Sequence, residues 1–96
     1  VKMIYVESCS NPNGFIPDFH YIKTLINTYN DKCLFVVDNT FLSPEVFKPL
    51  NYGVDIVIES CTKYISGKGD VLLGAVILRN VSENPNVEDN ILKEVY

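Results

Sequence analysis

The sequence predicts an α/β fold built on a mostly parallel sheet with helices on both faces. Four short apolar runs have the length of strands, and the first three do not alternate between apolar and polar residues. Helical or turn-rich segments separate these first three runs, as in chains that alternate strands with helices. A polar residue also stands near the carboxyl end of each of the three, where open α/β sheets bind ligands.

The first strand is expected from Met3 to Glu7, and its lack of alternation predicts that it is fully buried. Ser8 to Pro17 is rich in turn-forming residues, and Asp18 is well placed to cap a helix. That helix is expected from Phe19 to Tyr29, because apolar residues recur there at helical spacing.

The second strand is expected from Leu34 to Val37. After it, Ser43 and Pro44 predict the start of a short helix, with serine as the cap and proline as the first helical residue. Pro49 is expected to end or kink that helix. The third strand is expected from Asp55 to Ile58.

The fourth strand is expected from Ala75 to Leu78. The connection before it, which includes the loop Ile65 to Gly69, has little room for a crossover helix. A short connection favours an antiparallel fourth strand. A last amphipathic helix is expected from Val87 to Tyr96, and neither repeats nor low-complexity linkers divide the chain.

The composition argues against several classes of partner. A net charge of −4 with Arg79 as the only arginine argues against nucleic acid binding. The longest apolar run, Val71 to Leu78, has eight residues and is too short to cross a membrane. Three cysteines without CxxC spacing indicate free thiols in a reducing compartment, and the single histidine, His20, has no partner at metal-ligand spacing.

Lys63 stands just beyond the third strand, with Ser60 and Thr62 before it and two glycines after it. An amine at the carboxyl end of a parallel strand can attack a carbonyl group of a bound ligand. The two hydroxyl groups, together with backbone N–H groups, could hold an anion such as a phosphate. The alternatives are a solvated lysine in a loop and hydroxyl groups that only cap local turns.

Two more polar residues belong to the same pattern. Asp38 ends the second strand, 25 positions before Lys63, and Asn11 follows the first strand. A lysine for a Schiff base, an acid for a ring nitrogen and an amide for a ring hydroxyl are the groups that pyridoxal phosphate requires. The alternatives are an aspartate that caps the following turn and an ordinary Asn-Pro turn.

Three segments carry a resemblance to a known family. They are Glu7-Ser8-Cys9-Ser10-Asn11-Pro12, Val37-Asp38-Asn39-Thr40-Phe41 with Ser43-Pro44, and Ser60-Cys61-Thr62-Lys63-Tyr64 with Gly67 and Gly69-Asp70. In this order they resemble the Cys/Met-metabolism family of pyridoxal-phosphate enzymes, over about four-fifths of the chain. That family includes the cystathionine synthases and lyases, methionine γ-lyase and the homoserine-ester sulfhydrylases. The sequence departs from the family's usual residues at Cys9, Glu59 and Lys68.

The resemblance implies the fold type I (aminotransferase-like) architecture, a mixed sheet in which one antiparallel strand follows the lysine loop. Residues 1–96 would be the central part of the large, cofactor-binding domain, a fragment of a longer chain that forms a cytoplasmic homodimer or homotetramer. The ring-stacking tyrosine, the phosphate loop and the arginine for the substrate carboxylate would lie outside this segment. A tyrosine and an arginine of a neighbouring subunit would also reach the phosphate.

By the same resemblance, Lys63 would form the Schiff base with pyridoxal 5'-phosphate and then move protons. Asp38 would face the pyridine nitrogen, Ser60 and Thr62 would bind the phosphate, and Asn11 would lie near the ring hydroxyl. No metal ion is expected.

The implied reaction is elimination or replacement at the β or γ carbon of a sulfur-containing or homoserine-derived amino acid. A cystathionine or methionine γ-lyase is the first interpretation, and a cystathionine γ-synthase or O-acylhomoserine sulfhydrylase is the alternative. An aminotransferase or decarboxylase of the same fold fits the combined motif spacing less well. The last alternative is a cofactor-free paralogue or α/β interaction module, against which the presence of Asp38 and Lys63 argues.

Overall fold

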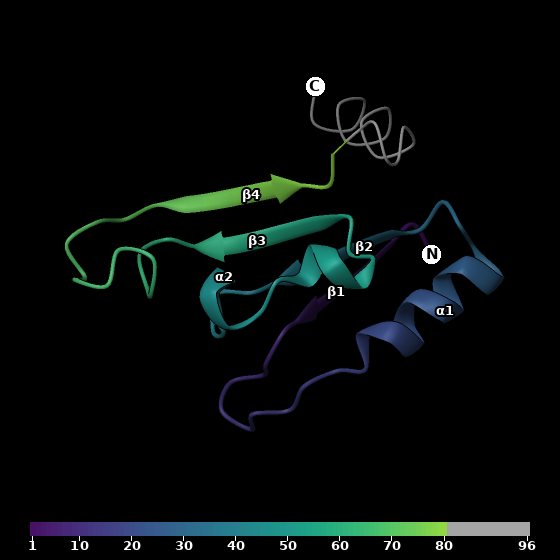
Figure 1. Ribbon diagram of the computed structural model, residues 1–96, viewed down its shortest axis with the longest axis horizontal. Coiled ribbons are helices and arrows are strands. Elements are labelled where there is room, and N and C mark those ends of the chain that lie inside the picture. Colours follow the sequence, from purple (N-terminus) through teal and green to yellow (C-terminus); the bar gives the residue numbers. More distant parts are fainter. Residues whose placement is uncertain (81–96) are drawn as a thin grey trace.

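Residues 1–80 are described by the computed structural model, and they form one four-stranded sheet in the order β1-β2-β3-β4 (Figure 1). The first three strands are parallel, and β4 pairs antiparallel with β3. The strands are β1 (Met3–Glu7), β2 (Leu34–Asp38), β3 (Ile56–Ser60) and β4 (Gly74–Leu78). The helical elements are α1 (Phe19–Tyr29), α2 (Ser43–Val46) and the 3-10 turn η1 (Pro49–Tyr52). The predicted fold class and the antiparallel fourth strand are confirmed, and the helix predicted for Val87–Tyr96 lies outside the described residues.

The element boundaries differ from the predictions at two informative places. Strand β3 continues to Ser60, because Ser60 still pairs with Gly74 of β4. The predicted capping role of Ser43 is wrong, because Ser43 has a positive φ of 64° and no side chain makes a capping hydrogen bond at the start of α2. Ser60 is therefore fixed by the sheet and is not a loop residue.

The apolar core lies between the sheet and α1. Asp18 caps this helix, as predicted, by accepting a hydrogen bond of 2.9 Å from the backbone N–H of Tyr21. The helix buries Phe19 and Ile26 against alternate residues of the two central strands. The core cluster consists of Phe19, Ile26, Cys33, Phe35, Val37, Val54 and Val57. Burial of this cluster is the main contribution that holds α1 on the sheet.

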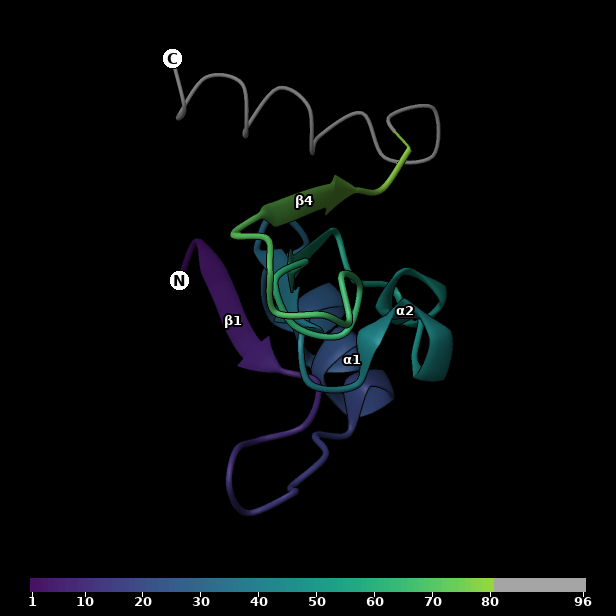
Figure 2. The ribbon, with the colours of Figure 1, turned by 90° about the vertical axis from the view of Figure 1, so that its left-hand side faces the viewer.

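The expectation that the first strand is fully buried is wrong. Residues Ile4 and Val6 pack on the core, whereas Met3 and Tyr5, which alternate with them, are 54% and 50% exposed. Helices α1 and α2 lie on the same side of the strands (Figure 2), so the described residues do not provide the second helical layer of the predicted fold. Side chains on the opposite face of β1 therefore depend on their strand neighbours for contacts.

Asp55 stabilises the edge of the sheet where β2 and β3 begin. Its Oδ2 accepts a hydrogen bond of 2.9 Å from the backbone N–H of Phe35, and this bond ties the start of β3 to β2. Lys23 and Arg79 bring cationic nitrogens to 3.9 Å and 4.0 Å from its Oδ1. Positive charge next to this buried carboxylate offsets the cost of removing it from water.

Residues 1–80 include no helix that is long and apolar enough to span a membrane.

Candidate functional site

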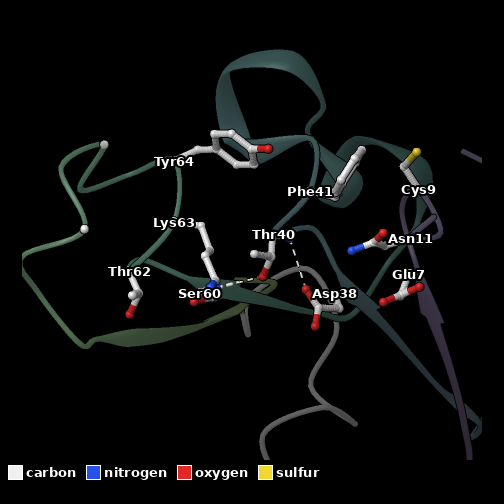
Figure 3. A pocket seen from close by; sticks show the side chains of 12 residues that line it. Glu7, Cys9, Asn11, Asp38, Thr40, Phe41, Ser60, Thr62, Lys63 and Tyr64 are labelled. Atoms are coloured by element: carbon white, nitrogen blue, oxygen red, sulfur yellow. Dashed lines mark hydrogen bonds between the residues drawn. The ribbon is translucent and has the colours of Figure 1, made fainter.

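A pocket of about 740 Å³ lies where β1, β2 and β3 end (Figure 3). This volume is typical of small-molecule sites. The five residues predicted from the sequence all line it: Asn11, Asp38, Ser60, Thr62 and Lys63. Because the three strands are parallel, their carboxyl ends meet at one edge of the sheet, and residues far apart in the chain come together there.

Asp38 is the last residue of β2, and both of its carboxylate oxygens accept hydrogen bonds. The backbone N–H of Thr40 donates to Oδ1 over 3.0 Å, and the hydroxyl of Tyr5 donates to Oδ2 over 3.0 Å. A carboxylate oxygen can accept more than one hydrogen bond. Asp38 can therefore keep both contacts and still accept a hydrogen bond from a molecule in the pocket.

Tyr5 is a residue of this site that the sequence analysis missed. Its pKa is raised above the ordinary value of 10.0 by burial, by the hydrogen bond to Asp38 and by the negative charges of Asp38 and Glu7. The phenol therefore stays protonated and remains a donor at neutral pH. No sequence pattern predicts this contact, because it depends on the register that pairs Glu7 with Asp38.

Lys63 lies in the turn that follows β3. Its backbone N–H donates to the carbonyl of Ser60 over 3.1 Å, and its carbonyl accepts from the N–H of Gly67 over 2.9 Å. The side chain of Lys63 is exposed, and its amine points toward Ser60 and Thr40 (Figure 3). The turn thus fixes the backbone of Lys63 and leaves its amine accessible from the pocket.

The two hydroxyl residues before Lys63 differ in their contacts. Ser60 is held by its backbone, whose N–H donates to Thr40 Oγ1 over 2.8 Å. The hydroxyl of Thr62 accepts from the N–H of Leu73 over 2.9 Å and donates to the Leu73 carbonyl oxygen over 3.3 Å. Thr62 therefore also ties the lysine turn to the segment that leads into β4.

Loop geometry completes the rim of the pocket. Gly67 and Gly69 have positive φ angles of 70° and 68°, a conformation that residues with a Cβ rarely adopt, so the backbone of this loop favours glycine at both positions. Asn11 lies in the loop after β1 and directs its amide toward Thr40 and Asp38 (Figure 3). The amide can therefore reach a ligand that contacts the same aspartate.

A buried polar pair, Asn39 and Glu59, lies next to the segment that contains α2. Asn39 Nδ2 donates to Glu59 Oε1 and to the Phe47 carbonyl, each over 2.9 Å, and so joins the ends of β2 and β3. Burial raises the pKa of Glu59 above its ordinary value of 4.5, the charge of Asp38 raises it further, and the hydrogen bond from Asn39 opposes both effects. The sequence analysis noted Glu59 only as a departure from the family pattern.

The donor set fits pyridoxal phosphate. An amine, a carboxylate and an amide surround one pocket, and they match an aldehyde, a pyridine nitrogen and a ring hydroxyl. On the lysine side of the same pocket, the hydroxyl of Ser60 can donate to a phosphate, and that of Thr62 can do so in exchange for its bond to the Leu73 carbonyl. Among residues 1–80 no cluster of three or more His, Cys, Asp or Glu side chains could hold a metal ion.

Comparison with known families gives a match over almost the whole chain. The sequence profile described as "Cys/Met metabolism PLP-dependent enzyme" matches residues 1–93. An L-methionine gamma-lyase from Treponema denticola is 38% identical over 76 residues, which are 79% of this chain and 19% of that protein. The chain thus spans about a fifth of the length of the curated relatives it matches.

Solved structures agree with the sequence comparison. The chain superimposes on a cystathionine gamma synthase from Xanthomonas oryzae pv. oryzae with a TM-score of 0.78 and 41% identity, over 90% of this chain and 22% of that one. A protein from Campylobacter jejuni described as an O-acetylhomoserine (thiol)-lyase gives a TM-score of 0.77 and 34% identity, over 91% of this chain and 22% of that one. The latter structure contains a pyridoxyl-lysine monophosphate.

Proposed function

The chain belongs to the Cys/Met metabolism family of PLP-dependent enzymes, and from this premise we propose that the full-length protein is a lyase of sulfur amino acids. The proposed reaction is β- or γ-elimination from a substrate such as cystathionine or methionine. The observation that carries the proposal is the shared pocket of Lys63 and Asp38, which come from different strand ends. An amine and a carboxylate on opposite sides of a ring-sized space are what this chemistry needs.

Pyridoxal phosphate, when bound, withdraws electrons from the substrate carbon next to the amino group and so acidifies its C–H bond. On this proposal, Lys63 binds the aldehyde carbon through its amine. When its amine is free, Lys63 Nζ would accept the proton from the substrate carbon and deliver it to the leaving group or product. The exposed position of Lys63 in the pocket allows both roles.

The other pocket residues hold and orient the cofactor on this proposal. The carboxylate of Asp38 keeps a proton on the pyridine nitrogen by its negative charge. The amide of Asn11 donates to the ring hydroxyl, and the hydroxyls of Ser60 and Thr62 donate to the phosphate. Thr62 would redirect its single hydroxyl proton from the Leu73 carbonyl to the phosphate, and it would still accept from the Leu73 N–H.

A replacement reaction is the second candidate. The cystathionine gamma synthase and the O-acetylhomoserine (thiol)-lyase match this chain as well as the lyases do, so the shared pocket serves either outcome. The full-length protein would act as a cytoplasmic homodimer or homotetramer, with residues 1–96 in the central part of the cofactor-binding domain. Segments outside this range and a neighbouring subunit would supply the remaining groups of the site.

The first test is the colour of the full-length protein after incubation with pyridoxal phosphate. The wild-type protein is expected to show a visible absorption band and, after borohydride reduction, to retain the cofactor on Lys63 in a peptide mass analysis. Lys63→Ala is expected to lose both signals, whereas Lys68→Ala, an exposed residue in the same loop, retains them. A colourless wild-type protein, or reduction at another lysine, would contradict the proposal.

The reaction itself is tested with three substrates offered to the loaded enzyme. Cystathionine and methionine alone report elimination through the release of a keto acid. An acylated homoserine with a thiol reports replacement through a new thioether. Products only in the third reaction would favour the synthase or sulfhydrylase alternative.

A further inference from the structure

Within residues 1–80, the carboxylate of Asp38 accepts two hydrogen bonds, one from a nearby residue of the chain and one from another strand. The bond from the Thr40 N–H is local, because the two residues are two positions apart. The bond from the Tyr5 hydroxyl comes from a neighbouring strand, 33 positions away in the chain. The orientation of the carboxylate thus depends on a contact between strands.

The sheet register explains how Tyr5 reaches Asp38. Strands β1 and β2 are parallel, with Tyr5 opposite Val36 and Glu7 opposite Asp38. Tyr5 therefore lies on the same face as Asp38, diagonally across the two strands, at a separation that long side chains span. Tyr5 is half-exposed and lies outside the core cluster, so packing in the core does not determine the position of its hydroxyl.

The charges around Asp38 explain why a phenol suits this position. Glu7 on β1 and Glu59 on β3 are acidic, and Lys63 on the turn after β3 is the cation that lines the same pocket. A lysine or arginine in place of Tyr5 would form an ion pair with the carboxylate of Asp38. The protonated ring nitrogen of a cofactor would then compete with that side chain for the carboxylate. Tyr5 offers a donor without a charge, so Asp38 keeps its full negative charge.

We propose that Tyr5 is a positioning residue for Asp38, whose carboxylate it holds in the orientation that meets the ring nitrogen of the cofactor. Rotation about the last side-chain torsion of an aspartate is soft, so the single bond from Thr40 leaves a freedom that the bond from Tyr5 removes. This inference rests on the proposed function. Orienting the carboxylate in advance lowers the entropy cost of binding the cofactor.

The test measures the Kd for pyridoxal phosphate in the full-length protein after removal of the cofactor. Tyr5→Phe deletes only the hydroxyl and is expected to raise the Kd about three- to tenfold, less than the full effect of a hydrogen bond to a charged group, because the hydroxyl contacts Asp38 and not the cofactor. The visible band of the bound cofactor is expected to shift as well, because the band responds to the charge at the ring nitrogen. Tyr29→Phe is the matched control, since Tyr29 is 82% exposed at the end of α1, and it is expected to change neither signal.

A double-mutant cycle separates positioning from a purely structural role. In an Asp38→Ala background, Tyr5→Phe is expected to cause no further rise in the Kd, because the hydroxyl then has no carboxylate to hold. Equal losses in both backgrounds, or an unchanged Kd and band in Tyr5→Phe alone, would overturn the inference while leaving the proposed function intact. A wild-type protein that binds no pyridoxal phosphate would overturn the proposed function and the inference together.

Discussion

Replacement of Asn39 by alanine is expected to destabilise the protein by about 2–3 kcal/mol at pH 8. Asn39 donates two buried hydrogen bonds of 2.9 Å, one to the Phe47 carbonyl and one to the carboxylate of Glu59. A neutral bond contributes about 1 kcal/mol and a bond to a charged group about 2–3 kcal/mol. The amide oxygen of Asn39 is buried without a partner among the described residues. Its removal therefore offsets about 1 kcal/mol of the lost stability.

The loss in Asn39→Ala is expected to shrink as the pH falls. Because the pKa of Glu59 is raised above 4.5, its side chain takes up a proton in the folded protein before it does so in the unfolded chain. Asn39 then donates to a neutral acid, and that bond contributes about 1 kcal/mol less than the bond to the ionised group.

Urea denaturation of Asn39→Ala and the wild type at pH 8 and pH 5 measures this difference. Asn27→Ala, an exposed substitution on α1, is the control and is expected to change stability by less than about 0.5 kcal/mol at either pH. An Asn39→Ala penalty that is the same at both pH values would refute the argument that the charge of Glu59 dominates the pair.

Two further substitutions test the structure. In Glu59→Gln, we expect stability to depend less on pH than in the wild type, as measured by urea midpoints from pH 4.5 to 8. The sign follows from the raised pKa: the stability that neutral Glu59 contributes is fully present below 4.5 and is lost as the pH rises through the raised value. Gly53→Ala places a residue with a Cβ at a φ of 81°, and a left-handed conformation alone lowers the free energy of unfolding by about 1–2 kcal/mol. We expect a larger loss, because the new Cβ would also lie 2.9 Å from Lys23 Cγ. Gly14→Ala, at a φ of 67° with no atom within 4 Å, isolates the conformational cost, and equal losses at both glycines would show that the contact with Lys23 is harmless.

Much of the candidate site could be predicted from the sequence because its residues follow strand ends. The apolar runs before Asp38 and Lys63 identify two strands, and the alternation of strands with helices makes them parallel. Parallel strands place their carboxyl ends together, so the shared pocket follows from local pattern and topology alone. Asn11 joins the pocket for the same reason, because it lies in the loop that follows β1.

The contacts within the site could not be predicted in this way. The bond from Tyr5 to Asp38 requires the register of β1 against β2, and a shift of one residue would turn Tyr5 to the other face. The pair of Asn39 and Glu59 likewise depends on how β2 and β3 end relative to one another.

The sequence by itself thus determined the strands, the helix Phe19–Tyr29 and five residues of the pocket, because these depend on local preference and short-range periodicity. Only the tertiary structure decided which partners the polar side chains of the site have, and also that Met3 and Tyr5 are exposed while Ile4 and Val6 are partly buried. The burial of a strand depends on which elements cover each of its faces, and an apolar run of five residues contains no information on that point.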